Sequence, residues 1–128
     1  MFTIGKLANQ AGVTVETVRF YQRNELLNVP EFHGKQRYYQ QTHLRRLRFI
    51  KGAQAAGFSL KEIKQLLTMD ASQDHAQVRS MARKRLQQLE VKMAQLAQSR
   101  QALLSLTEAC ESNPHEPCRI IAAFEYEI

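Results

Sequence analysis

The sequence contains only two cysteines, no apolar run as long as a membrane span, and no secretory signal of basic and then apolar residues at its start. These absences favour a cytoplasmic protein, where a cysteine pair is more often a metal site or reactive thiols than a disulfide. The sequence also lacks a nucleophile–base pair, a phosphate-binding loop and a carboxylate pair on one helix face. We therefore expect neither an enzyme nor a membrane partner.

Neither proline nor glycine occurs from Asp74 to Glu108, which predicts one helix of roughly 35 residues and about 50 Å. Its apolar residues follow a heptad pattern that is interrupted only where Arg100 takes a core position; they are Ala82, Leu86, Leu89, Met93, Leu96 and Leu103. No other predicted helix is long enough to cover this seam. We expect the partner to be the same helix of a second copy, in a two-fold homodimer.

The positive charge is concentrated in the first half of the chain, although the whole chain has a net charge of only +6. Residues 1–68 contain eleven lysines and arginines against four acids, whereas residues 69–128 contain seven against eight. A basic half favours a polyanionic partner, because each phosphate contact releases condensed counterions. Charge alone does not separate DNA, RNA and an acidic membrane.

Two short helices joined by a glycine-containing turn are predicted at the start of the chain. Thr3 can cap the first (residues 4–11), Gly12 ends it, and Thr14 can cap the second (residues 15–23). This is a helix-turn-helix pattern, whose second helix enters the major groove of DNA. With Val15 and Val18 packed inward, the residues available to DNA are Thr14, Glu16, Thr17, Arg19 and Tyr21. An ordinary helical hairpin is the alternative.

Residues 24–40 predict a loop and a small hairpin. Pro30 and Gly34 mark the turns, and Arg37, Tyr38 and Tyr39 form a short strand-like run. A basic and aromatic hairpin beside a helix-turn-helix is typical of a wing on the phosphate backbone, so Arg37 and Tyr38 are further candidate DNA contacts. The alternative is a solvated loop with packed tyrosines.

Two more helices complete the basic half. The third is predicted over residues 42–57, ends at Gly57, and has as its apolar positions Leu44, Leu47, Phe49, Ile50 and Ala53. Ser59 and Glu62 form a capping box for the fourth, which begins at Leu60. The charged face of the third helix, with Arg45, Arg46, Arg48 and Lys51, is expected to be a solvated surface.

The chain resembles the MerR family of bacterial transcription regulators along essentially its whole length. The residues that carry the resemblance are ETVRFYQR at 16–23, RYY at 37–39 and AQAAGFSLKEIKQLL at 53–67, with the long helix and the cysteine loop. The resemblance implies a mostly α fold: a winged helix-turn-helix domain (1–70), a long antiparallel coiled-coil dimerisation helix (74–108), and a metal-binding loop with a short helix (109–128).

The resemblance also implies functional residues and a mechanism. Arg19 and Tyr21 would contact DNA from the second helix, and Arg37 would bind phosphates from the wing. The family hairpin usually reads Asn-Gly-Tyr-Arg, whereas this chain has Gly34, Lys35, Gln36 and Arg37, so the wing contact differs. Family members bind promoter DNA as homodimers. Inducer binding makes the dimer bend and untwist the DNA, so that RNA polymerase engages both promoter elements.

Cys110 and Cys118 flank a seven-residue loop stiffened by Pro114 and Pro117, and a short amphipathic helix from about Arg119 follows. Two thiols in this arrangement can converge on one soft metal ion. The metal-sensing branch of the family places two ligand cysteines here, so the resemblance implies a metal site.

The third ligand decides which metal is sensed. In the family, the first residue of the long helix is the selectivity position, with Cys in sensors of divalent ions and Ser in sensors of monovalent ions. This chain has His75, so a partner subunit would donate an imidazole, and His115 of the loop could join it. Such a set of sulfur and nitrogen ligands favours a divalent ion, Ni²⁺ or Zn²⁺ first and Co²⁺ also.

Three alternatives stay open. The first is a sensor of another metal in the same family. The seven-residue loop matches the copper sensors and keeps Cu(I) or Ag(I) possible, and Hg(II) is also open, although it would be expected to favour three sulfurs. A thiol-based sensor of electrophiles or oxidants is a different class. Finally, His75 and His115 could be ordinary polar residues with no ligand role.

Overall fold

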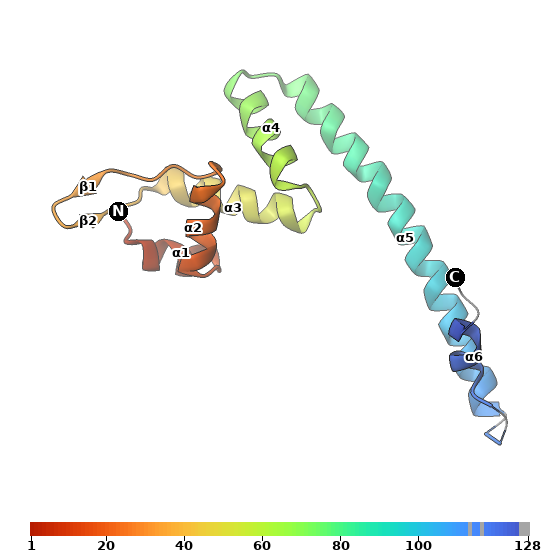
Figure 1. Cartoon of the computed structure of the whole chain (residues 1–128). Helices are drawn as coiled ribbons and strands as arrows, with labels where there is room; N and C mark the ends of the chain where they lie inside the picture. The colour runs from red at the N-terminus through yellow and green to blue at the C-terminus, as the bar shows by residue number, and fades with distance from the viewer. Residues whose placement is uncertain (113, 116, 126–128) are drawn as a thin grey trace. The chain divides into compact units, whose positions relative to one another are not determined.

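The computed structural model describes residues 1–112, 114, 115 and 117–125. These residues form six helices and one two-stranded sheet, in the order α1, α2, β1, β2, α3, α4, α5 and α6 (Figure 1). The chain divides into two compact units, Met1–Met81 and Ala82–Ile128. The mostly helical fold with a small wing and a long helix confirms the predicted fold class. The predicted division into three segments stays a prediction.

The first two helices form as the sequence predicts. Helix α1 spans Ile4–Ala11, and the Thr3 hydroxyl accepts the N–H of Lys6. Gly12 ends α1 with φ 71°, in the left-handed region that glycine adopts without strain. Helix α2 spans Val15–Arg23, and the Thr14 hydroxyl accepts the N–H of Thr17. Each cap satisfies an N–H group that the first helical turn leaves without a partner.

The wing is a hairpin of strands β1 (Phe32–His33) and β2 (Gln36–Arg37), paired antiparallel. Tyr39 lies outside β2 and instead forms an isolated bridge with Phe2, with both N–H···O=C distances at 2.7 Å. The predicted strand-like run from Arg37 to Tyr39 is therefore too long. Tyr39 is buried because this bridge ties the end of the wing to the chain before α1.

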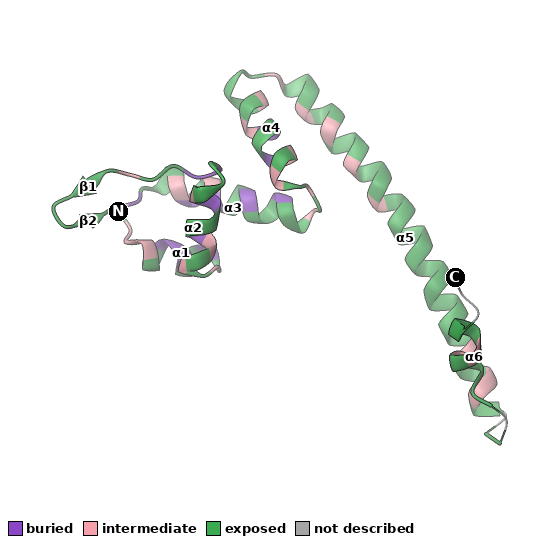
Figure 2. Ribbon diagram, in the orientation of Figure 1, coloured by how far each residue is buried: buried purple, intermediate pink, exposed green. Residues whose placement is uncertain are grey.

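Helix α3 (Gln41–Ala55) and helix α4 (Leu60–Ala71) complete the first unit, and the predicted capping box between Ser59 and Glu62 is present. One core joins the four helices of this unit (Figure 2), and its fully buried side chains are Leu7, Val18, Leu44, Leu47, Ile50 and Ile63. Burying each such side chain contributes about 1.5–3 kcal/mol. Phe49, one of the apolar positions of α3, is 40% exposed, although the neighbouring Ile50 is buried.

Helix α5 spans His75–Ser112, and none of its residues is buried in the single chain. It begins where the N–H of Gln77 donates to Asp74 Oδ1 at 3.3 Å. It ends four residues beyond the predicted Glu108, just before Pro114, and so includes Cys110. The heptad seam is largely exposed, with Met93 at 68% and Leu96 at 69%, as expected of a surface that a second copy covers (Figure 2).

Helix α6 (Arg119–Glu125) follows the cysteine loop, where the sequence predicts a short helix. Its residues Ile121 and Phe124 are 59% and 53% exposed. The predicted third segment extends over residues 126–128, which lie outside the described residues.

Candidate DNA-binding surface and metal centre

Helix α2 presents polar side chains along one exposed face. The Thr14 and Thr17 hydroxyls hydrogen-bond to each other at 2.9 Å, and Glu16 forms an ion pair with Arg23 at 3.1 Å. Arg19 is exposed and lies on the side of α2 that faces the wing. The structure thus leaves four of the five predicted side chains of this helix-turn-helix on the surface or at its edge, where they can reach a base or a phosphate.

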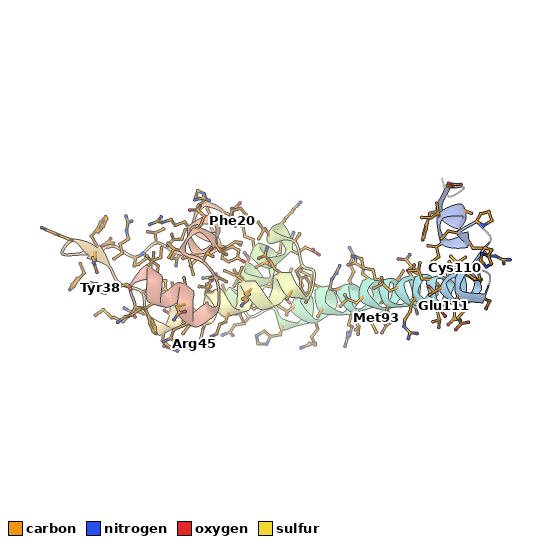
Figure 3. The ribbon with its side chains drawn as sticks, turned by 90° about the horizontal axis from the view of Figure 1, so that it is seen from below. Phe20, Tyr38, Arg45, Met93, Cys110 and Glu111 are labelled. Carbon is orange, nitrogen blue, oxygen red and sulfur yellow. The ribbon has the colours of Figure 1, made fainter. Side chains whose placement is uncertain are left out.

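Tyr21 is the exception, and its predicted availability to DNA is wrong. Its ring is only 4% exposed, and its hydroxyl donates a hydrogen bond to Gln54 Oε1 of α3. Burial raises the pKa of this phenol above its ordinary value. The reason lies in helix geometry: Tyr21 follows Val18 by three residues, so both side chains point to the same core. Its neighbour Phe20 is the partly exposed ring (Figure 3).

The wing orients Arg37 through an aromatic contact. Phe32 and Arg37 stand opposite each other in the ladder, and the Arg37 guanidinium carbon lies 4.0 Å from the centroid of the Phe32 ring. The hairpin turn is Gly34 and Lys35, with positive φ at Gly34 (70°) and not at Lys35. This is the pattern of a type II′ turn, which places a lysine at the tip of the wing.

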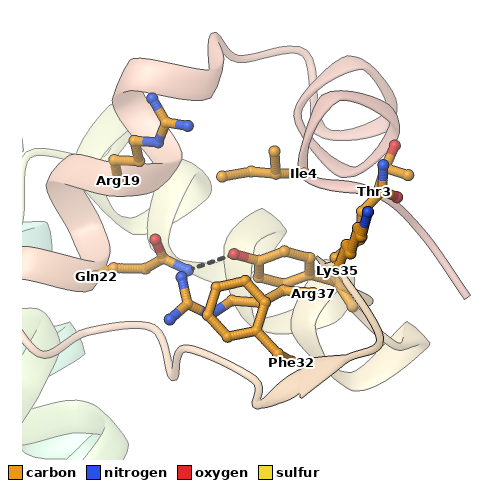
Figure 4. A pocket seen from close by; sticks show the side chains of 9 residues that line it. Thr3, Ile4, Arg19, Gln22, Phe32, Lys35 and Arg37 are labelled. Atoms are coloured by element: carbon orange, nitrogen blue, oxygen red, sulfur yellow. Dashed lines mark hydrogen bonds between the residues drawn. The ribbon is translucent and has the colours of Figure 1, made fainter.

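A cleft of about 300 Å³ lies between the wing and α2 (Figure 4), and we refer to it as the wing–helix cleft. Its three charged lining residues, Arg19, Lys35 and Arg37, are all cationic. The other lining residues are Thr3, Ile4, Gln22, Phe32, Gln36 and Tyr39. A cleft of one sign of charge beside a predicted recognition helix is suited to an anion such as a backbone phosphate.

One hydrogen bond connects the two sides of this cleft. Gln22 Nε2 of α2 donates to the Tyr39 hydroxyl at 2.7 Å, drawn as a dashed line in Figure 4. The rings of His43 and Tyr39 pack edge to face, with 5.3 Å between ring centroids and an interplanar angle of 82°. Tyr39 therefore ties the base of the wing to both α2 and α3. Tyr38, the other predicted wing contact, is partly buried.

Several contacts in this unit were not predicted from the sequence. Lys51, which was expected on a solvated helix face, donates to the carbonyl oxygens of Ala11 and Gly12 at 3.1 and 3.2 Å. It thereby stabilises the end of α1, since those carbonyls have no partner within the helix. Phe32 and Gln22 were also missed. The position of Phe32 directly across a short hairpin from Arg37 is the signal that could have identified it.

The two cysteines lie together at the end of α5. Cys110 is in the last turn of α5 (Figure 3) and Cys118 immediately precedes α6, and the two thiols are close enough for each to shift the pKa of the other. The backbone N–H groups of Ile121 and Ile120 also hydrogen-bond to the Cys118 sulfur. Cys118 is exposed and Cys110 is partly buried, and neither forms a disulfide. The two cysteines therefore lie near each other within one chain, and their convergence on a metal ion stays a prediction.

These contacts make the two thiols unequal. The N–H groups of Ile121 and Ile120 lower the pKa of Cys118, whereas the hydrogen bond to Cys118 raises the pKa of Cys110. Cys118 is therefore the more readily ionised thiol of the pair. Because a thiolate is the form that binds metal ions, the pair is suited to a soft or borderline cation.

The structure does not bring either candidate histidine to the cysteine pair. Across the described residues, no three His, Cys, Asp or Glu side chains lie close enough together to hold a metal ion. His115 lies in the loop, is exposed, and is not grouped with the two sulfurs in the described part of the chain, so its role as a further ligand stays a prediction. His75 begins α5 and Cys110 lies near its other end, so His75 can reach a cysteine pair only from another subunit.

Comparison with known proteins shows which family has this architecture. Residues 2–70 match the family described as "MerR HTH family regulatory protein", and residues 44–106 match "MerR, DNA binding". The chain belongs to the MerR family. As a member of it, the chain binds promoter DNA as a homodimer and is not an enzyme. No helix within the described part of the chain has the length and apolar character needed to cross a membrane.

The chain is similar to several metal-responsive members of the MerR family. It is 41% identical to the mercuric resistance operon regulatory protein of Serratia marcescens over 98% of this chain and 88% of that protein. It matches the MerR regulator of Bacillus megaterium MB1 in complex with mercury(II) with a TM-score of 0.66 and 34% identity, over 97% and 99% of the chains. It matches PbrR691 of Ralstonia metallidurans CH34, in complex with lead(II), with a TM-score of 0.68 and 34% identity, over 86% of this chain and 88% of that chain.

Proposed function

We propose that this MerR-family homodimer is a cytoplasmic transcriptional activator that responds to a divalent transition metal ion, Ni²⁺, Zn²⁺ or Co²⁺. The ligands are Cys110 and Cys118 of one subunit and the partner subunit's His75. The observation that carries the proposal is the cysteine pair, whose two thiols influence each other and which has no third candidate ligand close to it among the described residues of its own chain.

The exposed seam of α5 explains how the third ligand arrives. Its apolar side chains need a second copy, and an antiparallel pair of α5 helices brings the start of one helix beside the end of the other. His75 is the first residue of α5, and Cys110 lies in its last turn. Pairing in this direction would complete one metal centre at each end of the dimer.

The mixed ligand set favours a borderline divalent ion. Two thiolates and one imidazole match the sulfur and nitrogen ligands of Zn²⁺, and imidazole also suits Ni²⁺. Cu(I) prefers two thiolates alone, whereas the proposed set adds the partner subunit's His75. His115 is not part of the proposed set, because the structure does not place it with the sulfurs.

At the other end of the molecule, α2 would enter the major groove with Thr14, Glu16, Thr17 and Arg19 towards the bases. The wing would press Arg37 and Tyr38 on the phosphate backbone. Metal binding favours the dimer state that bends and untwists the promoter, so that RNA polymerase can engage both of its elements. The ion acts by its unequal affinity for the two states of the dimer.

A competition titration of the reduced homodimer with Ni²⁺, Zn²⁺, Co²⁺ and Cu(I) tests the proposal, with transcription measured in the same series. His75→Ala should abolish the divalent response, whereas His115→Ala, the matched control, should leave it unchanged. A response to Cu(I) alone that survives His75→Ala would refute the proposed ligand set.

Mixed dimers test whether His75 comes from the partner. A dimer of one His75→Ala subunit and one Cys118→Ser subunit retains one complete site if the ligands are shared between chains. It retains none if each chain uses its own histidine. Half of the wild-type metal stoichiometry is therefore the expected result, and no bound metal is the result that contradicts it.

Mercury(II) is the second candidate inducer, because two of the similar proteins are a mercuric resistance regulator and a mercury(II) complex. Hg²⁺ prefers sulfur, so it would bind the cysteine pair and depend little on His75. The same titration therefore separates the two candidates: Hg(II) activation should survive His75→Ala, whereas Ni²⁺, Zn²⁺ or Co²⁺ activation should not.

A thiol-based sensor is the alternative from another class, and the lowered pKa of Cys118 beside a second thiol is the observation that favours it. Hydrogen peroxide would oxidise the Cys118 thiolate to a sulfenate, and Cys110 would then form a disulfide with release of water. Activation by peroxide in the presence of a metal chelator would support this function. Activation that requires metal and is lost on oxidation would exclude it.

A further inference from the structure

Phe32 is an exposed aromatic residue that contributes nothing to the core. It is 62% exposed in a strand of two residues, and it is absent from the buried cluster that joins the helices of the first unit. Its ring nevertheless contacts Arg37, whose guanidinium carbon lies 4.0 Å from the ring centroid. Residues directly opposite in an antiparallel ladder point to the same face, so the backbone register itself produces this contact.

The contact leaves the hydrogen-bonding edge of Arg37 available. A guanidinium that lies over a ring uses its flat face, and its N–H donors point outward in the plane. Over the described residues, Arg37 has no carboxylate partner and donates no hydrogen bond within the protein. Phe32 therefore holds a charged group in place without neutralising it, which is what an anion site requires.

The surroundings of Arg37 indicate the class of anion. The wing–helix cleft also contains Arg19 from α2 and Lys35 from the turn, and no acidic side chain lines it. Gln22 and Tyr39 span the cleft by their hydrogen bond, so its two sides keep a fixed spacing (Figure 4). Three cations around one cleft on the DNA-binding unit fit a backbone phosphate.

We propose that Phe32 is a positioning residue for DNA binding, whose ring holds the Arg37 guanidinium ready for a phosphate at the wing–helix cleft. This inference rests on the proposed phosphate contact of Arg37. An exposed arginine otherwise samples many rotamers, and this freedom is lost when it binds. The ring restricts those rotamers before DNA arrives, and so removes part of that cost.

The binding experiment uses the full-length homodimer and a short DNA duplex of mixed sequence, since a phosphate contact does not depend on sequence. The variants are Phe32→Leu, Phe32→Tyr, Arg37→Ala and the double variant Phe32→Leu/Arg37→Ala. A cation–π contact at an exposed site corresponds to about a two- to five-fold change, so with two wings Phe32→Leu should weaken binding about four- to twenty-five-fold per dimer. Phe32→Tyr, which keeps the ring, should restore wild-type affinity.

The salt dependence and the double variant separate positioning from direct contact. Arg37→Ala should lower the slope of log affinity against log salt by about two per dimer, because two phosphate contacts are lost. Phe32→Leu should leave this slope unchanged, and it should have no effect in the Arg37→Ala background. An equal loss on Phe32→Leu in both backgrounds would overturn the inference, because Phe32 would then act independently of Arg37.

A second measurement needs no DNA. In the NMR spectrum of the free homodimer, the ring should shift the Arg37 side-chain N–H signal upfield, and Phe32→Leu should abolish this shift while Phe32→Tyr retains it. An Arg37 signal that is the same in all three proteins would refute the positioning role. If the ring shifts the Arg37 signal but Arg37→Ala leaves the slope of log affinity against log salt unchanged, the proposed phosphate contact is wrong while the contact between Phe32 and Arg37 stands.

Discussion

Replacing Tyr21 by phenylalanine separates a core role of this residue from a DNA-binding role. The structure buries the ring and directs the hydroxyl to Gln54 of α3. Tyr21→Phe keeps the ring and removes only this hydrogen bond. Gln54 is exposed, so water can solvate its carbonyl in the variant and no buried acceptor loses its partner.

The magnitude follows from these two facts. A neutral hydrogen bond contributes about 0.5–1.5 kcal/mol to the free energy of unfolding, and no further penalty for an unsatisfied group is added here. For a unit of this size, a loss of about 1 kcal/mol lowers the Tm by about 4–8 °C. Tyr21→Ala removes the ring as well, and such a change in a core costs about 3–5 kcal/mol.

Thermal melts followed by circular dichroism measure the stability, and fluorescence anisotropy with duplex DNA measures the affinity well below the melting range. Tyr21→Phe should lower the Tm and leave the DNA affinity unchanged. Tyr38→Phe is the matched control, because it removes a hydroxyl outside the core and should change the stability by less than about 0.5 kcal/mol. An unchanged Tm together with weaker DNA binding by Tyr21→Phe would refute the core placement.

Three further predictions concern other parts of the chain. Ser59→Ala removes the cap of α4 and should cost about 1 kcal/mol in denaturant unfolding, whereas an unchanged midpoint would contradict the capping box. Burial lowers the pKa of His43, whose Nδ1 also accepts the N–H of Gln40, so the unfolded chain binds the proton more readily. The stability contribution of His43 should be complete above pH 6.5 and decrease as the pH falls through the lowered pKa, and His43→Gln should flatten this part of a Tm–pH profile. Leu96→Glu places a charge on the exposed seam and should give monomers by analytical ultracentrifugation, whereas Gln98→Glu, off the seam, should stay dimeric.

The boundaries of the first helices were predictable because local signals determine them. Threonine at positions 3 and 14 and glycine at position 12 act within a single turn, and the structure confirms these helix limits. The end of α5 was predicted too early. It continues beyond Glu108 to Ser112, because no proline or glycine interrupts the chain up to that residue.

The faces of the helices were harder to predict, because they depend on which elements pack together. Tyr21 was assigned to DNA and is buried in the structure, whereas Phe49, one of the apolar positions predicted for the third helix, is 40% exposed. For Tyr21 the three-residue spacing from the buried Val18 already indicated the core. For Phe49 no such signal decides, since the apolar residues of α3 surround the helix more widely than one packing face requires.

The candidate metal centre also has one part that was predictable from the sequence and another that was not. That Cys110 and Cys118 lie together was predictable, because a short proline-containing loop connects them. The position of His115 depends on the conformation of the loop, and the sequence does not specify that the side chain stays away from the sulfurs. The partner's His75 can be assigned only from the exposed seam of α5 and the direction in which two copies pair.

Because α5 buries no residue in its own chain, the protein concentration determines how many subunits form the dimer that can bind the promoter. A helix that buries nothing in its own chain draws most of its stability from its partner, so its melting should depend on protein concentration while that of the first unit should not. At low abundance the amount of dimer rises with the square of the free subunit concentration. The amount of protein in the cell therefore sets how strongly the promoter can respond, before any inducer is present.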